Sequence, residues 1–185
     1  QDCGQTGGKV DLNAADHWIT SRLQATIQTV TTALDTYRID LAAQAIYDFT
    51  WNEYCDWYLE LSKSVLTNPQ SSETALRGTR KTLVQTLEAL LRLAHPIMPF
   101  ITEEIWQRVA PLAGAKGPTI MHQAYPSFDA TVVDADSEKA IGWVKTFILG
   151  IRKIRGEQNI KPSKALPVLL QNGSKQDQSY LKHYG

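Results

Sequence analysis

The stretch that decides the fold covers residues 13–37 and reads NAADHWITSRLQATIQTVTTALDTY. Its apolar residues recur in steps of three and four, which is the spacing that places side chains on one face of an α-helix. Asn13 and Asp16 stand at its start, and both residue types cap helix N-termini. The pattern therefore predicts an amphipathic helix. Its apolar face comprises Ile19, Leu23, Ile27, Val30, Leu34 and Tyr37.

The same periodicity continues through most of the chain. Each later segment also carries a start or stop signal, such as a polar capping residue or a proline. The chain is therefore predicted to be mainly α-helical, a bundle of helices with short connections. The further predicted helices are residues 40–66 capped by Asp40, residues 72–94 ended by the His95-Pro96 step, a short helix capped by Thr102, and residues 137–156, with a long connection over residues 111–136.

The last part of the chain has a different pattern. Ala165–Leu170 is a short apolar run followed by the turn signal Asn172-Gly173, which favours a strand. A lone strand is unstable, so we expect its partners to lie outside these residues. The domain prediction is a flexible lead-in over residues 1–10, a helical domain over 11–160 and the start of a truncated α/β segment over 161–185.

Composition limits the classes of function. The formal net charge is zero, whereas proteins that grip long stretches of nucleic acid are usually basic, so any such contact should be local or shared with other segments. No apolar run approaches the roughly 18 residues that cross a bilayer. Cys3 and Cys55 form no C-x-x-C pair, and two free thiols fit a reducing, cytoplasmic location. Because the chain opens with Gln1, we interpret it as a piece of a longer protein.

No catalytic constellation is recognisable. The four histidines lack metal-ligand spacing, and there is no G-x-S-x-G motif or glycine-rich phosphate loop. Residues 161–165, KPSKA, resemble the ATP-binding K-M-S-K-S loop of class I synthetases, but Pro162 and Ala165 depart from it, and no nucleotide-binding fold surrounds it. We interpret this segment as a junction loop. The remaining hypotheses are an RNA-binding module and a non-catalytic helical protein-interaction scaffold, which would expose an apolar patch and lack a basic stripe.

Residues 51–60, WNEYCDWYLE, concentrate aromatic side chains. In an α-helix Trp51, Tyr54 and Tyr58 would share one face, while Trp57 and Leu59 fall away from it. One interpretation is that most of these rings are core. The other is that one or two apolar side chains at the edge stack on RNA bases, which contributes roughly 1–3 kcal/mol per base.

Basic residues gather in two places. Arg77, Arg80 and Lys81 stand together, and a second group runs from Lys145 to Lys164. Such stripes suit a phosphate backbone. They equally suit a solvated helix face with cations near its C-terminal end. The sequence alone leaves both interpretations open.

Four stretches of the sequence carry a family resemblance. Residues 95–106, HPIMPFITEEIW, resemble the H-P-x-x-P-F-x-x-E-x-x-W signature of anticodon-binding domains in isoleucyl-, valyl- and related tRNA synthetases, and residues 49–60 resemble the corresponding helix. Leucyl enzymes typically have histidine where Phe100 stands. Residues 151–162, IRKIRGEQNIKP, and the opening DCG resemble bacterial valyl enzymes in particular. The alternative is the matching domain of an isoleucyl enzyme, and the 151–162 run is the discriminator.

The resemblance implies a class Ia anticodon-binding bundle from a cytoplasmic, monomeric enzyme that joins valine to tRNA(Val) using ATP and Mg²⁺. It also implies that the catalytic, editing and coiled-coil domains of the same chain lie outside these residues. This piece would then hold no catalytic residue, cofactor or metal.

The resemblance further implies which side chains meet the tRNA. Asp56, Trp57 and Leu59 are the candidate base contacts, with Leu59 the first choice because it departs from the aromatic stripe. Arg77, Arg80, Arg152 and Arg155 are weaker candidates for phosphate contacts, and Trp106 is expected in the core.

Overall fold

The computed structural model describes residues 2–161, 163–165 and 167–184. The chain forms two compact units, Gln1–Ala135 and Asp136–Gly185. In the described part of the chain the regular structure is helical, without strands, as predicted for the bundle. The first unit contains α1 (Ala14–Asp35), α2 (Ile39–Asp48), η1 (Phe49–Tyr58), α3 (Leu59–Leu66), α4 (Glu73–Ala94), α5 (Pro99–Ala113), η2 (Ile120–His122) and η3 (Ala130–Val132).

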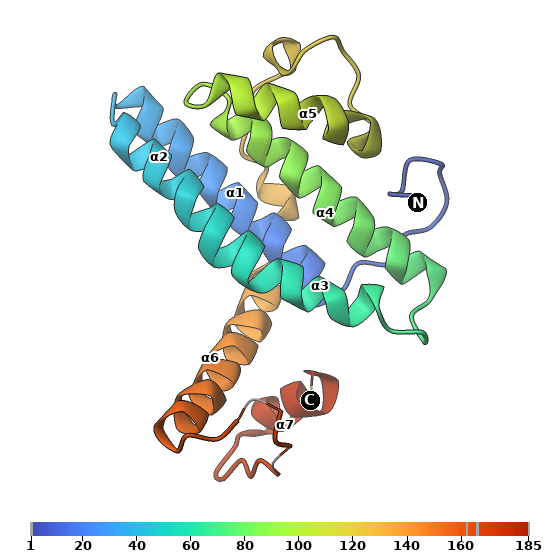
Figure 1. Ribbon diagram of the computed structural model, residues 1–185, viewed down its shortest axis with the longest axis vertical. Helices are drawn as coiled ribbons and strands as arrows, with labels where there is room; N and C mark the ends of the chain where they lie inside the picture. The colour runs from blue at the N-terminus through green and yellow to red at the C-terminus, as the bar shows by residue number, and fades with distance from the viewer. Residues whose placement is uncertain (1, 162, 166, 185) are drawn as a thin grey trace. The chain divides into compact units, whose positions relative to one another are not determined.

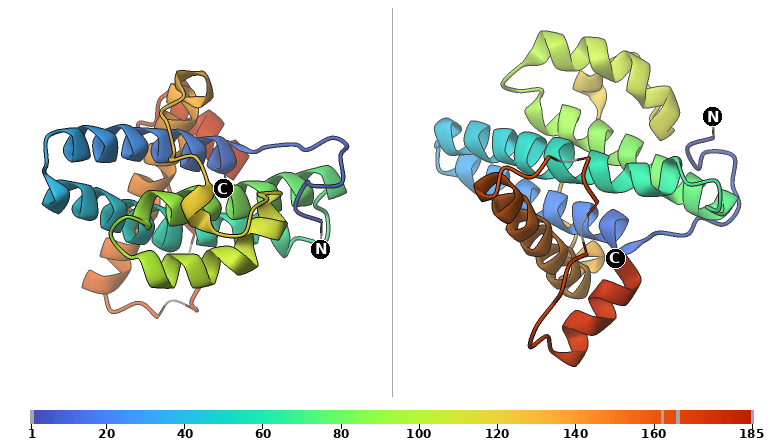
Figure 2. Two further views of the ribbon diagram at one scale, coloured as in Figure 1. Left: turned by 90° about the horizontal axis from the view of Figure 1, so that it is seen from above. Right: turned by 60° about the horizontal axis from the view of Figure 1, so that its bottom comes forward.

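The first unit is built around α1. Helices α2, η1 and α3 follow one another as a continuous helical rod, and this rod and α4 both pack against α1 (Figures 1 and 2). Helix α5 packs against α4. The predicted apolar face of α1 is confirmed at four positions, because Ile19, Leu23, Ile27 and Val30 are buried. Tyr37 lies beyond the end of α1 and is 90% exposed.

A capping box begins α1. The Asn13 side chain accepts hydrogen bonds from the backbone N–H groups of Ala15 (2.7 Å) and Asp16 (3.0 Å). In return the Asp16 carboxylate accepts from the backbone N–H of Asn13 at 3.0 Å. This reciprocal pair satisfies donors that a helix start would otherwise leave unbonded. Both predicted capping residues therefore act together.

Asp16 also joins three helices. The carboxylate is fully buried, and it accepts hydrogen bonds from the Tyr58 hydroxyl (2.6 Å) and the Thr79 hydroxyl (3.2 Å). Tyr58 ends η1, and Thr79 lies in the second turn of α4. Burial raises the pKa of Asp16, and the bonds from Tyr58, Asn13 and Thr79 oppose that rise.

The helix predicted over residues 40–66 has the expected extent but a different middle. Phe49–Tyr58 is a π-helix, in which hydrogen bonds run five residues back, and the N–H of Leu59 still donates to the Tyr54 carbonyl. Tyr54 and Tyr58 are buried, whereas Trp51 is 52% exposed. The prediction that these three share one face was wrong, because it assumed 3.6 residues per turn.

Two predicted caps were also wrong. Asp40 lies inside the first turn of α2, where it pairs with Arg38, the residue at the cap position. Helix α5 begins at Pro99, whose fixed φ suits a first helical position. Thr102 is therefore inside α5, and its hydroxyl bonds the Met98 carbonyl and the His95 ring.

The α4–α5 contact is centred on a buried carboxylate. The indole N–H of Trp106 donates to Glu88 Oε1 at 2.9 Å, and Arg92 pairs with the same carboxylate. Arg92 also donates to the carbonyl of Ala124 in the predicted long connection. Trp106 is 1% exposed, so its prediction as a core residue is confirmed.

The second unit contains most of α6 (Ala135–Glu157) and all of α7 (Lys175–Tyr184). Residue 166 lies outside the described residues, and Ala165 and residues 167–170 form no strand. The predicted strand is thus not formed in the described part, because an extended segment needs a paired neighbour. Instead Trp143 of α6 contacts α7, by a hydrogen bond to Asp177 (2.7 Å) and ring contact with Tyr180.

The raised pKa of Asp16 predicts a definite pH dependence of stability. Asp16 binds its proton more tightly in the folded state than in the unfolded chain, where its pKa is near 3.8. The pH is lowered from neutral, through the raised pKa of folded Asp16, towards 3.8. Over this range the free energy of unfolding of the native protein should rise relative to that of Asp16→Asn. Urea titrations at several pH values measure this difference. If the difference in unfolding free energy stays constant, or changes in the opposite direction, the pKa of Asp16 is not raised by folding.

Candidate nucleic-acid interface

Three of the predicted contact residues lie together where η1 passes into α3. Asp56 is exposed, Trp57 and Leu59 are half-buried, and Tyr58 between them is fully buried. Tyr58 is held by Asp16 of α1, and the Tyr54 hydroxyl donates to the Leu83 carbonyl of α4 at 3.0 Å. Two buried tyrosines thus anchor the inner side of this segment. Asp56 faces solvent, and Trp57 and Leu59 are partly exposed on either side of Tyr58.

A second aromatic surface was missed by the sequence reasoning. Tyr47 and Trp51 are 56% and 52% exposed, and their ring centroids lie 6.5 Å apart. They line an apolar concavity of about 340 Å³, whose other side is formed by Ala94, Ile97 and Met98. The π-helix is the cause, because it turns Trp51 away from the buried tyrosines. The alternative of an interaction scaffold requires a surface of this kind.

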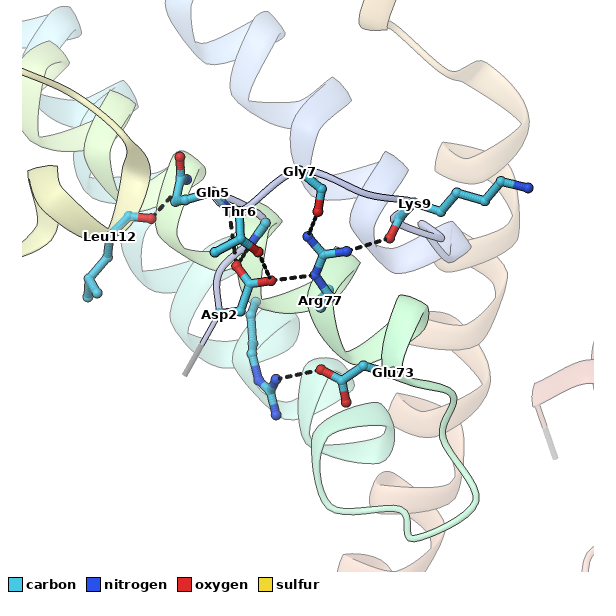
Figure 3. Close-up of polar contacts among 10 residues, drawn as sticks. Asp2, Gln5, Thr6, Gly7, Lys9, Glu73, Arg77 and Leu112 are labelled. Atoms are coloured by element: carbon cyan, nitrogen blue, oxygen red, sulfur yellow. Dashed lines mark hydrogen bonds and ion pairs between the residues drawn. The ribbon is translucent and has the colours of Figure 1, made fainter.

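Arg77 is engaged by the lead-in segment (Figure 3). Its Nε donates to Asp2 Oδ2 at 2.6 Å, and its terminal nitrogens donate to the carbonyls of Gly7 and Lys9. The side chain is only 11% exposed. A phosphate that bound Arg77 would therefore have to replace contacts made within the chain.

The lead-in carries its own polar cluster. Asp2 accepts hydrogen bonds from the Thr6 hydroxyl and from the backbone N–H groups of Gly4 and Gln5. The bonds from Thr6, Arg77 and Gly4 lower the pKa of Asp2 to about 2. The Gln5 side chain donates to the Leu112 carbonyl at the end of α5. Residues 2–9, predicted as a flexible lead-in, thus have specific partners on two helices.

A glycine on α4 permits the approach of the segment that follows the lead-in. A Cβ atom on Gly78 would lie 2.1 Å from the carbonyl oxygen of Asp11, which is far inside contact distance. The backbone N–H of Asp11 donates to the Thr74 carbonyl.

Arg80, the α4 residue after Thr79, pairs at 3.7 Å with the largely exposed Glu73.

The other two predicted cations belong to the second unit. Arg152 and Arg155 line a concavity of about 590 Å³ at the C-terminal end of α6, together with Asn159, Ile160 and Lys161. Arg155 donates to the carbonyls of Lys161 (2.9 Å) and Lys164 (2.7 Å). The structure therefore brings Arg152, Arg155 and Lys161 around one hollow. It places Arg77 and Arg80 at the start of α4, in the first unit.

Among the described residues, no group of three or more His, Cys, Asp or Glu side chains is placed to hold a metal ion. None of the helices in this part of the chain is both long and apolar enough to span a membrane.

In a comparison with protein families, the model described as the anticodon-binding domain of tRNA ligase matches residues 16–170. The match begins within α1, extends past the end of α6 and includes Asp56, Trp57 and Leu59.

The contacts of Arg77 predict a large difference between two neighbouring arginines. Arg77→Ala should lower the free energy of unfolding by about 1.5–3 kcal/mol, because several hydrogen bonds of a charged, mostly buried group are lost. Arg80→Ala should cost about 0–1 kcal/mol, because its 3.7 Å ion pair is with a largely exposed carboxylate. Chemical denaturation of both variants measures this. Equal losses would show that the lead-in contributes nothing through Arg77.

Proposed function

The chain belongs to the family of anticodon-binding domains of tRNA ligases, and from this membership we propose that it is the anticodon-reading part of a valyl-tRNA synthetase. The proposal of valine over isoleucine is supported by residues 151–162, IRKIRGEQNIKP, and by the opening DCG. The joining of valine to tRNA(Val), with its use of ATP and Mg²⁺, is proposed to take place in other parts of a longer cytoplasmic enzyme.

The observation that carries the proposal is the outward surface at the η1–α3 junction. Leu59 is half-buried, so its side chain can pack against a flat base while its backbone stays fixed in the helix. Trp57 offers a ring of the kind that bases stack on. The exposed Asp56 carboxylate can accept hydrogen bonds from the amino and imino groups of a base edge. These three neighbouring residues are proposed to supply stacking and edge contacts to splayed anticodon bases.

The four arginines are proposed as phosphate contacts that supplement the base contacts. Arg152 and Arg155 surround a hollow with Lys161, which suits a phosphate, although Arg155 also bonds the carbonyls of Lys161 and Lys164. Arg77 and Arg80 pair with Asp2 and Glu73, so a phosphate would compete with those carboxylates. A chain of zero net charge is compatible with this role if other parts of the enzyme supply most of the attraction for the tRNA backbone.

A second function is favoured by the concavity beside Tyr47 and Trp51. Its lining is apolar, and it lies at the α2–η1 boundary rather than at the η1–α3 junction. Such a surface suits packing against another helix or protein. This scaffold function and anticodon reading use different side chains, so the same chain can perform both.

Fluorescence anisotropy of this chain with labelled tRNA(Val), at two salt concentrations, tests the proposal. The natural anticodon should bind more tightly than the same tRNA with altered anticodon bases. The preference should persist at higher salt, because base contacts depend less on salt than phosphate contacts do. Leu59→Ala should reduce the preference by about tenfold, within the range of one lost stacking contact. Leu61→Ala, a half-buried leucine two residues away, is the matched control and should retain it.

Two outcomes would count against the proposal. Equal and salt-sensitive binding of both tRNAs would mean that the chain supplies only charge. A preference for an isoleucine tRNA over tRNA(Val) would assign the chain to the isoleucyl enzymes instead.

A further inference from the structure

The π-helix η1 decides which side chains of the aromatic segment face inward. Phe49, Tyr54 and Tyr58 are 2%, 7% and 0% exposed, and they follow one another at steps of five and four residues. An α-helix turns by roughly 100° per residue. Over the nine residues from Phe49 to Tyr58 it would turn by roughly 900°, which leaves the two rings on opposite faces. The wider turn of the π-helix brings both rings to the core.

This register needs an external constraint. Helices with hydrogen bonds five residues back are rare and short, because the α-helical alternative is close at hand for the same residues. A shift of η1 to α-helical spacing would rotate Tyr58 out of its site. The same rotation would carry Trp57 and Leu59 to other directions, since both follow the same backbone.

One hydrogen bond ties the end of η1 to a fixed point. The Tyr58 hydroxyl donates to Asp16 Oδ1 at 2.6 Å, inside the core. Asp16 is itself held at the start of α1 by the Asn13 N–H and from α4 by Thr79. A hydrogen bond to a buried carboxylate is stronger than one between neutral groups, and leaving that carboxylate short of a donor is costly.

We propose that the Tyr58–Asp16 hydrogen bond locks η1 in its π-helical register and thereby positions Trp57 and Leu59 for reading a base. Asp16 and Tyr58 are thus positioning residues for specificity, although neither side chain is exposed. The register lock rests on the structure alone, whereas the effect on base reading rests on the proposed function.

Two matched variants separate positioning from stability. Tyr58→Phe and Thr79→Val each remove one hydroxyl donor from Asp16, but only the first lies on η1. Both retain the side-chain volume that fills the core. Cys55, which is half-buried within η1, reports the register through its rate of alkylation in a Cys3→Ser background.

In the first measurement, the Cys55 alkylation rate should change by about tenfold in Tyr58→Phe. Loss of one hydrogen bond to a charged group is enough to shift the populations of the π-helical and α-helical registers by that factor. In Thr79→Val the rate should remain near that of the parent. Circular dichroism confirms that both variants are folded. Equal changes in the two variants, or no change in either, would overturn the register lock.

In the second measurement, the ratio of affinities for natural and altered anticodons is determined for the same variants. Tyr58→Phe should lower the ratio by about tenfold, on the scale of one lost base contact. Thr79→Val should preserve it. A preserved ratio in Tyr58→Phe, with a changed Cys55 rate, would overturn the positioning role. Absence of any preference in the parent protein would overturn the proposed function, while the Cys55 rates would still decide the register lock.

Discussion

The first unit depends on one buried carboxylate. Asp16 accepts hydrogen bonds from its own helix start, from Tyr58 at the end of η1 and from Thr79 on α4. Burying a carboxylate is unfavourable unless its oxygens receive donors. The three elements that supply these donors must therefore come together in one arrangement. Apolar contacts along α1 favour compactness, but they are less directional, so this polar junction specifies the register in which the helices meet.

That register separates two surfaces of different chemistry. At the η1–α3 junction, Asp56, Trp57 and Leu59 combine a carboxylate with apolar groups on a rigid support. At the α2–η1 boundary, Tyr47 and Trp51 border an apolar hollow. A regular α-helix over the same residues would not have buried both Phe49 and Tyr58. The unusual helix is thus the physical link between the fold and the proposed reading of a base.

Periodicity predicted the long helices well, because α1, α4 and α6 bury residues at helical spacing. Helices α1 and α4 also begin at capping residues, Asn13 and Ser72. Periodicity failed where a non-local contact decided the outcome. The π-helix cannot be read from apolar spacing alone, since it depends on Asp16 and Leu83, which are distant in sequence. The same is true of the lead-in, whose three glycines indicated flexibility although Asp2 pairs with Arg77.

For the candidate site, the motif at residues 95–106 and the aromatic segment pointed to the family that the comparison shows. The choice of Leu59 was based on its departure from the aromatic stripe, and it stays a prediction. Arg77 illustrates the limit of charge patterns, because the sequence shows a cation but not the carboxylate and carbonyls that surround it. The assignment to valine rests on residue patterns, and the base-reading role rests on the surface at the η1–α3 junction.

The most direct measurement of that role uses the complete enzyme with Leu59→Ala. Valine activation by ATP and the charging of tRNA(Val) are measured separately in the same preparation. Charging should fall by about tenfold, on the scale of one lost base contact, while activation stays unchanged. An equal fall in both steps would show instead that Leu59 serves folding and not anticodon reading.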